Sequence, residues 1–180
     1  RQTAAASLDK QVMTELAPLK MERAVFTTQI KAAPASPSGQ DQVTFTIATN
    51  LGTPAGPLNK VASGGELSRF LLALKVCLSA GALGQVMIFD EIDRGVGGAT
   101  ADAVGRRLQC LAQDMQILVV THSPQVAALG AHHWRVEKHT QSGMTLSQVV
   151  PLSPQDRVEE IARMLSADQI TPQARLAAQA

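Results

Sequence analysis

The sequence has few of the residues that mark several common protein classes. Of its 180 residues, two are cysteine, 3% are aromatic and none is tyrosine. Cys77 and Cys110 lie inside apolar periodic stretches. We therefore expect neither a disulfide scaffold nor a zinc knuckle, and we expect a reducing, cytoplasmic environment. The scarcity of aromatic side chains also leaves no platform on which nucleic-acid bases would stack.

Charge and hydrophobicity exclude further classes. Charged residues make up 17% of the chain, and 16 Lys and Arg against 15 Asp and Glu give a net charge of +1. This balance excludes a strongly basic nucleic-acid arm and an acidic tail. No apolar run is long enough to cross a bilayer and no secretory signal is visible, so we expect no membrane partner. The hydrophobic content of 45% is enough for a buried core.

The first part of the chain is predicted to be helical and then antiparallel. A helix is predicted over residues 4–21, with apolar side chains at spacings of four, four and three: Leu8, Val12, Leu16 and Leu19. This narrow strip suits a coiled-coil seam or an ordinary surface helix, although Pro18 argues against an uninterrupted helix. Residues 24–31 and 42–49 are predicted to form a hairpin around a turn-rich loop at 33–39.

The pattern changes after residue 62, where helices alternate with short apolar runs. The predicted helices are 66–80, 99–113, a short one opening at Pro124, and 156–165; the predicted strands are 86–89, 116–120, 134–138 and 145–150. Continuous apolar runs are typical of strands covered on both faces, and alternation with helices indicates a parallel sheet. We predict an α/β fold with a mainly parallel sheet, flanking helices and an antiparallel β appendage.

Polar side chains follow both apolar runs, where ligands bind in open parallel sheets. Asp90 and Glu91 follow Phe89, and such a pair offers one carboxylate to Mg²⁺ and the other to a water that attacks a phosphoryl group. The alternative is that the two residues merely begin a polar loop. His122 follows the second run, where an imidazole can bind a phosphate oxygen or water, although a lone histidine there is more often structural.

A glycine pair precedes the first helix of this part. Gly64 and Gly65 leave backbone N–H groups open to an anion at the helix N-terminus, and Ser63 adds a hydroxyl donor. The alternative is a capping box, in which Ser63 and Glu66 satisfy the first N–H groups of the helix. The intervening glycines favour the anion site, because glycine costs helix stability.

These motifs together resemble the C-terminal half of an ATP-binding-cassette (ABC) head. In detail they resemble the RecN family of bacterial double-strand-break repair ATPases, which is related to the structural-maintenance-of-chromosomes (SMC) proteins. The resemblance covers roughly residues 58–166. The segments that carry it are Ala62–Arg69, Ile88–Asp93, Gly95–Ala101, Val119–Ala128 and Arg157–Leu165.

The resemblance implies a role for each motif. Asp90 resembles the Walker B carboxylate that binds Mg²⁺, Glu91 the base for the attacking water, and His122 the switch histidine at the γ-phosphate. The residues that resemble the signature motif, which closes on ATP held by a second head, are Ser63, Gly64, Gly65 and Glu66. The resemblance thus implies ATP and Mg²⁺ as cofactors, a second head in a homodimer, DNA as a partner and a nucleoid-associated location.

Two features depart from the family pattern, and one part of it is missing. Gly97 stands at the D-loop aspartate of related heads, and Arg94 is charged where a small or apolar residue is expected. No G-x-x-x-x-G-K-[ST] motif occurs, so we expect the N-terminal Walker A half of the same protein as a partner. The predicted parts are the end of a coiled-coil arm (1–22), the C-terminal half of the head (23–166) and a tail (167–180).

Three functions remain in competition. The first is an ATP-binding and hydrolysing head segment that drives head dimerisation and DNA tethering, and the second is a non-enzymatic ATP-gated dimerisation and DNA-holding module. The third is a metal-dependent hydrolase that uses Asp90, Glu91, His122 and His132 or His133, although this spacing resembles no zinc motif. The basic residues are scattered, so DNA as a partner follows from the resemblance alone.

Overall fold

The computed structural model describes residues 1–37, 39–50, 52–58, 64–79, 84–141, 144–166 and 169–179. The chain divides into two compact units, Arg1–Val120 and Thr121–Ala180. The elements of the first unit are α1 (Gln2–Leu16), β1 (Val25–Ser36), β2 (Gly39–Ala48), β3 (Gly56–Pro57), α2 (Gly64–Ser79), β4 (Val86–Asp90), α3 (Gly98–Leu111) and β5 (Gln116–Val120). Those of the second unit are α4 (Pro124–Ala128), β6 (Trp134–Gln141), β7 (Met144–Pro151), α5 (Pro154–Leu165) and α6 (Pro172–Gln179).

This set of helices, one parallel strand pair and antiparallel sheets confirms the α/β fold class. Among the residues that the structure describes, no helix combines the length and apolar character needed to span a membrane.

The first helix ends earlier than the sequence pattern predicted. Regular α-helix stops at Leu16, and Pro18 in the next turn has no N–H for a helical bond. The N–H of Lys20 donates to the Ala17 oxygen and that of Met21 to the Leu16 oxygen, both at 3.1 Å. Lys20 has a left-handed backbone, with φ of 60°. This pattern is a Schellman motif, which terminates the helix by satisfying its last carbonyls.

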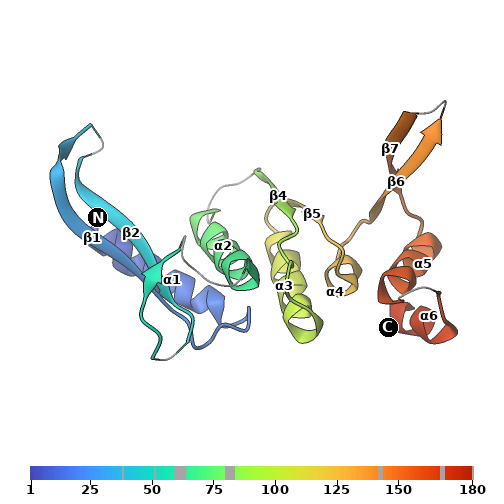
Figure 1. The fold of residues 1–180 in the computed structure, drawn as a ribbon, viewed down its shortest axis with the longest axis horizontal. Coiled ribbons are helices and arrows are strands. Elements are labelled where there is room, and N and C mark those ends of the chain that lie inside the picture. The colour runs from blue at the N-terminus through green and yellow to red at the C-terminus, as the bar shows by residue number, and fades with distance from the viewer. Residues whose placement is uncertain are drawn as a thin grey trace. The chain divides into compact units, whose positions relative to one another are not determined.

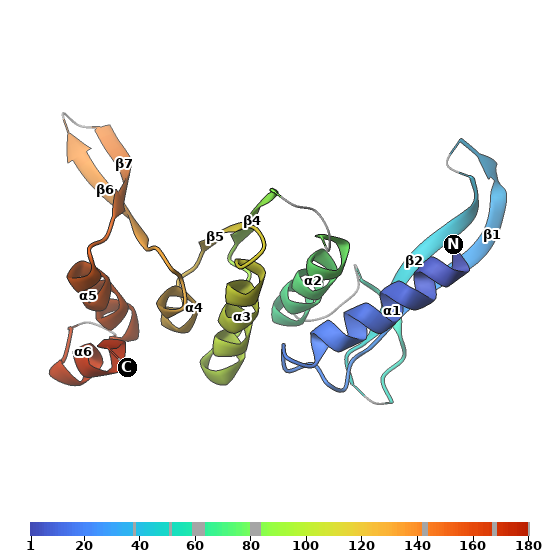
Figure 2. The same ribbon diagram turned by 180° about the vertical axis from the view of Figure 1, so that it is seen from behind.

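The predicted hairpin forms beside α1, as Figures 1 and 2 show. Strands β1 and β2 are antiparallel, with Phe26 opposite Ile47. The prediction of a loop over 33–39 was wrong in part, because β1 continues to Ser36. The register shifts between Ala32 and Ser36, and such an irregularity accommodates Pro34, which has no N–H for the ladder.

Side chains of α1 cover the outer edge of β1. One carboxylate oxygen of Asp9 accepts hydrogen bonds from the N–H of Thr28 at 2.9 Å and from its hydroxyl at 2.6 Å. The sulfur of Met13 accepts the N–H of Phe26 at 3.3 Å. Unpaired N–H groups on an edge strand invite pairing with another chain, so these contacts protect this stretch of β1.

The core of the first unit lies where α1, β1 and α2 meet. Leu16, Leu19 and Phe70 are completely buried, and Phe26 is 2% exposed. The rings of Phe26 and Phe70 pack with centroids 5.1 Å apart and planes tilted by 48°. Tilted aromatic pairs of this kind add stability beyond the area that they bury, so α2 is held firmly against β1.

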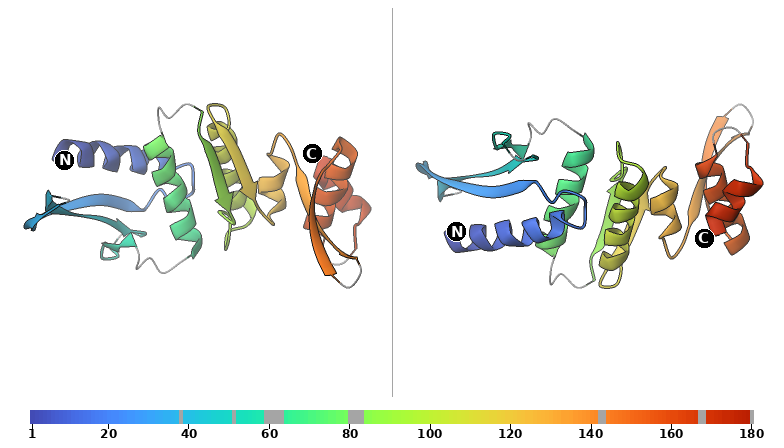
Figure 3. Two further views of the ribbon diagram at one scale, coloured as in Figure 1. Left: turned by 90° about the horizontal axis from the view of Figure 1, so that it is seen from above. Right: turned by 90° about the horizontal axis from the view of Figure 1, so that it is seen from below.

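Strands β4 and β5 form the parallel pair, with α3 along one side of it (Figure 3). Phe89 is 2% exposed, whereas Ile88, Val86 and Val120 are 55–65% exposed. Side chains alternate along a strand, so the Ile88 face of the pair is open in this chain. Within this chain, therefore, the Ile88 face lacks the cover that the continuous apolar runs predicted.

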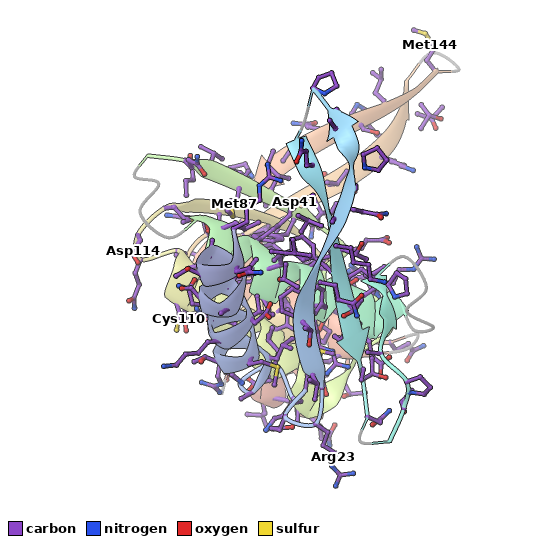
Figure 4. All side chains as sticks on the ribbon, turned by 90° about the vertical axis from the view of Figure 1, so that its left-hand side faces the viewer. Arg23, Asp41, Met87, Cys110, Asp114 and Met144 are labelled. Atoms are coloured by element: carbon purple, nitrogen blue, oxygen red, sulfur yellow. The ribbon has the colours of Figure 1, made fainter. Side chains whose placement is uncertain are left out.

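The second unit combines the β6–β7 hairpin with α4, α5 and α6. Met144 marks the turn end of this hairpin in Figure 4. A guanidinium nitrogen of Arg157 on α5 donates to the Ala128 oxygen at the end of α4 at 2.7 Å. Residues 172–179 form α6, which packs on α5 through the Arg175–Glu159 ion pair at 2.7 Å. The sequence pattern had predicted only a loosely held tail here.

Candidate functional site

The carboxylate pair lies at the carboxyl end of the parallel strands. Asp90 is the last residue of β4 and faces Val120 in register. The ladder continues one residue further, because the N–H of Glu91 donates to the Val120 oxygen at 2.9 Å. Asp90 shares the open face of the pair with Ile88, and it is exposed. Within the part of the chain that the structure describes, its carboxylate makes no ion pair, so it can take a cation.

Glu91 leaves the strand in an unusual conformation. Its φ of 48° lies in the left-handed region, which costs a residue with a Cβ about 1–2 kcal/mol. The change of backbone direction breaks the alternation of the strand, so Glu91 does not simply occupy the face opposite Asp90. Half of its side chain is exposed. Strain of this kind is concentrated at functional sites.

Arg94, which the sequence pattern did not account for, lies beside Glu91. A guanidinium nitrogen of Arg94 is 3.5 Å from a carboxylate oxygen of Glu91. The main-chain N–H of Arg94 also donates to the main-chain oxygen of Glu91 at 3.0 Å. The Arg94 side chain is 78% exposed. Exposed pairs of this kind contribute about 0–1 kcal/mol, so a stronger ligand can displace the guanidinium.

The loop after Glu91 folds back on the start of α2. Gly95 has a φ of 74°, a conformation for which glycine is the natural residue. A Cβ added to Gly65 would lie 3.0 Å from the Val96 side chain and 3.2 Å from the Arg94 oxygen. Gly65 is therefore required by the close approach of the two segments. The signature-like turn and the loop after Glu91 are therefore in direct contact.

Gly64 has a different environment from its neighbour. It is exposed, and a Cβ added to it would meet no described atom within 4 Å. Packing thus accounts for Gly65 and leaves Gly64 open at the N-terminus of α2, where an anion would be bound. Glu66 lies in the first turn of α2. Ser63 lies outside the described residues, so the capping box stays untested.

His122 lies in the second unit, two residues after Val120 in the sequence. It is exposed. The N–H of the next residue, Ser123, donates to the Thr121 hydroxyl at 2.9 Å, and Ser123 is the N-cap of α4. The backbone around the imidazole is therefore fixed by its neighbours. Whether His122 shares a ligand with Asp90 stays a prediction, since the two residues belong to different units.

This arrangement fits Mg²⁺ better than a metal held only by protein. The described residues contain no group of three or more His, Cys, Asp or Glu side chains that could hold a metal ion. A zinc hydrolase needs about three protein ligands, whereas Mg²⁺ uses one or two carboxylates together with phosphate oxygens and water. Asp90, exposed at the end of β4, suits the second case.

The sequence pattern missed two further structural features of the first unit. Arg69 bonds main-chain oxygens far away in the sequence. A groove of about 680 Å³ between α1, α2 and α3 is lined by the Glu15–Arg107 ion pair and both cysteines. Cys110 and Asp114 of this groove lie on one side of α1 in Figure 4. Neither feature has a local sequence signal, because each depends on segments brought together by folding.

The chain is similar in sequence to proteins named DNA repair protein RecN. It is 44% identical over 169 residues to the Vibrio cholerae protein, covering 93% of this chain and 30% of that protein. It is 45% identical over 172 residues to the Rickettsia prowazekii protein (95% and 31%) and 49% identical over 142 residues to a Xylella fastidiosa protein (79% and 26%). The chain thus spans less than a third of the length of these relatives. No protein-family model matches it.

Solved structures show the same fold at lower sequence identity. An Smc head domain with a coiled coil and joint from Pyrococcus yayanosii matches with a TM-score of 0.69 and 20% identity, covering 88% of this chain and 29% of that one. A structure from work on ATP-driven dimerization and DNA-stimulated activation of SMC ATPases matches with a TM-score of 0.65 and 17% identity, covering 93% and 96%. Over nearly its whole length, the chain therefore belongs with the C-terminal part of the RecN family and has the fold of an SMC head.

Proposed function

We propose that this chain forms the Mg²⁺-binding and water-activating side of an ABC-type ATPase head in a RecN-type DNA repair protein. The observation that carries the proposal is the edge after β4. There an exposed Asp90 is followed by Glu91 in a left-handed conformation, and the next loop packs on Gly65 beside an open Gly64. A cation ligand, a base and an anion-binding turn thus lie on segments that are linked by this contact.

Each residue has a defined task in this proposal. Mg²⁺, when bound, neutralises charge on the phosphate oxygens. Asp90 holds this ion, directly or through water. Glu91 accepts a proton from the water that attacks the terminal phosphorus, and the bond from that phosphorus to the bridging oxygen of ADP breaks. His122 binds a terminal phosphate oxygen through a ring N–H.

The signature-like turn acts on a second nucleotide. Gly64 presents an open backbone at the N-terminus of α2, which attracts negative charge. We propose that this turn, with Ser63 and Glu66, closes on ATP held by a second copy of the head. ATP is then part of the dimer interface, and each round of hydrolysis separates the heads. This cycle would tether DNA, in keeping with a cytoplasmic, nucleoid-associated protein.

The head also needs a phosphate-binding loop, for which this sequence has no G-x-x-x-x-G-K-[ST] motif. The open face of the β4–β5 pair suggests where the missing segment packs. Three apolar side chains are more than half exposed on it: Val86, Ile88 and Val120. Apolar strands in parallel sheets are normally covered on both faces. We propose that the Walker A half of the protein covers this face and brings its loop to Asp90.

The Glu91–Arg94 pair favours a second candidate, an ATP-gated dimerisation and DNA-holding module with negligible turnover. The guanidinium lies 3.5 Å from the carboxylate that is to accept the proton. A guanidinium at this distance occupies the place beside the carboxylate where the attacking water would lie, so a pair that persists in the ATP-bound head would slow hydrolysis. Turnover of the complete head, measured with and without DNA, separates the two candidates.

The proposal is tested by Glu91→Gln in the complete head, which contains the Walker A half. We expect the variant to bind ATP within about twofold of the parent and to dimerise, while hydrolysis falls by about 100-fold or more, as for loss of a general base. Glu159→Gln is the matched control, because Glu159 is an exposed partner of Arg175 in the second unit. Near-normal hydrolysis by the Glu91 variant would refute the assigned base.

A further inference from the structure

Arg69 joins two segments that lie far apart in the sequence. Its Nη1 donates to the Leu19 oxygen at 2.9 Å and to the Lys20 oxygen at 3.2 Å, across 50 and 49 residues of chain. Its Nε donates to the Gly65 oxygen at 3.2 Å. One planar guanidinium therefore joins the turn that follows α1 to the first turn of α2. Arginine suits this task because its donors form a rigid fork.

The end of α1 is well suited to receive this cation. Leu19 is completely buried, and Lys20 is fixed in the left-handed position of the Schellman motif. Arg69 donates to the main-chain oxygens of Leu19 and Lys20, which lie in this turn directly after α1. The guanidinium is therefore tied to the hydrogen-bonded turn that terminates α1.

The other end of the bridge leads to the candidate site. The Gly65 oxygen accepts from Arg69, and the Cα of Gly65 is packed so closely that an added Cβ would lie 3.3 Å from the Gly95 oxygen. The backbones of Gly65 and Gly95 thus approach each other without intervening side chains. Because close-packed segments move together or not at all, a shift of α1 reaches the loop after Glu91 through this path.

We propose that Arg69 is a positioning residue that couples the end of α1 to the Gly64–Gly65 turn and to the loop that follows Glu91. The inference rests on the proposed function, in which this turn closes on ATP of a second head. A displacement of α1 then moves the Gly64–Gly65 turn, and closure of this turn on ATP constrains α1. The direct ligands of ATP are other residues.

The surroundings of Arg69 keep the bridge in place. Burial lowers the pKa of the Arg69 guanidinium, whereas the nearby carboxylates of Glu66 and Glu22 raise it. An arginine side chain has a pKa so high that this opposition leaves it charged at any physiological pH. The coupling is therefore a mechanical link and not a pH switch.

The test uses the complete head in a Glu91→Gln background, where ATP-bound dimers persist. In Arg69→Met we expect ATP affinity within about twofold of the parent and a dimer dissociation constant raised roughly tenfold, a typical coupling between sites. Arg69→Lys keeps the charge but loses the fork, so its effect should be smaller. Arg106→Met is the control, because Arg106 is exposed and pairs only with Asp102 among the described residues.

Amide hydrogen exchange supplies a readout that a merely structural residue would not change. ATP should slow exchange at residues 19–21 in the parent protein and leave it unchanged in the Arg69 variants. Failure of the Glu91→Gln parent to dimerise with ATP would refute the proposed function. Normal dimerisation, and a normal ATP response at residues 19–21, in Arg69→Met would overturn the coupling. If Arg69→Met does not fold, the same measurements on Arg69→Lys decide the question. The coupling would also be overturned if the Arg69 variants lost ATP affinity and dimerisation in parallel.

Discussion

Two regions of the first unit differ in how completely this chain buries their apolar side chains. Where α1, β1 and α2 meet, Phe26 and Phe70 are buried and Asp9 covers the edge of β1. At the β4–β5 pair, Phe89 is buried, but Ile88 on the opposite face is 65% exposed. The first region is a closed core, whereas the second has an uncovered face that includes Asp90. The chemistry that we propose lies at the region that is open.

The largest expected effect contrasts one residue from each region. Phe70→Ala should lower the free energy of unfolding by about 3–5 kcal/mol, because it leaves a cavity in a packed core. Ile88→Ala should change it by about 0.5 kcal/mol or less, since Ile88 is 65% exposed. Urea unfolding of this chain measures both values. Equal effects would mean that the two regions are equally closed, and the comparison would fail.

A charge on the open face should act on assembly and not on the chain itself. Ile88→Asp is expected to leave the unfolding curve of the isolated chain almost unchanged. It should weaken association with the Walker A half by about 30-fold or more, because an unpaired carboxylate would be buried at the contact. Leu176→Asp is the control, since Leu176 is 68% exposed on α6. Undiminished association of the Ile88 variant would show that this face is not the one covered.

The sequence predicted the open region better than its surroundings. Strands β4 and β5 were found from continuous apolar runs, and their parallel pairing put Asp90 at the edge where Glu91 follows. The pattern could not show that the Ile88 face is uncovered, because an apolar run looks the same whether its cover lies in this chain or in another. The left-handed φ of Glu91 also has no signal in the residue type.

Long-range contacts and weak local patterns explain the remaining differences. The hydrogen bond from Arg69 to the Leu19 oxygen joins residues 50 positions apart, which no local periodicity reveals. Pro34 suggested a loop, yet the shift of register lets β1 continue past it. Helix α6 is short and has no buried residue, so its apolar pattern was too weak to separate it from a tail.

An ion pair joins α1 of the closed core to α3 beside the β4–β5 pair, and its loss should have an intermediate effect. Nε of Arg107 on α3 lies 2.5 Å from a carboxylate oxygen of Glu15 on α1, and the two side chains are only 22% and 20% exposed. Arg107→Met should lower the free energy of unfolding by about 1–2 kcal/mol, because it leaves Glu15 without this partner in a partly buried place. Arg106→Met should cost clearly less than Arg107→Met, since the Arg106–Asp102 pair is exposed. Equal costs in urea unfolding would contradict this difference.

The smallest expected effect is a pH dependence of stability that comes from His133 in the second unit. It tests whether this unit unfolds independently of the two regions compared above. Burial, and then the charge of Arg157, lowers the pKa of the His133 imidazole, and Arg135 adds to this while Glu160 opposes it. Its buried Nδ1 has no hydrogen-bond partner among the described residues. Below about pH 6.5 the unfolded state therefore binds more protons than the folded state. Stability should fall as the pH drops from about 6.5 through the lowered pKa, and should not depend on this group at higher pH.

Trp134, the single tryptophan of the chain, reports this change because it lies next to His133 in the second unit. Acid should shift the unfolding transition seen by Trp134 fluorescence, and His133→Asn should remove the shift. His139→Asn is the control, since His139 is exposed on β6. If the effects of Phe70→Ala and of acid appear in separate transitions, the closed core and the second unit are independent. If acid acts equally in His133→Asn, the buried imidazole is not its cause, and the exposed carboxylates must be considered instead.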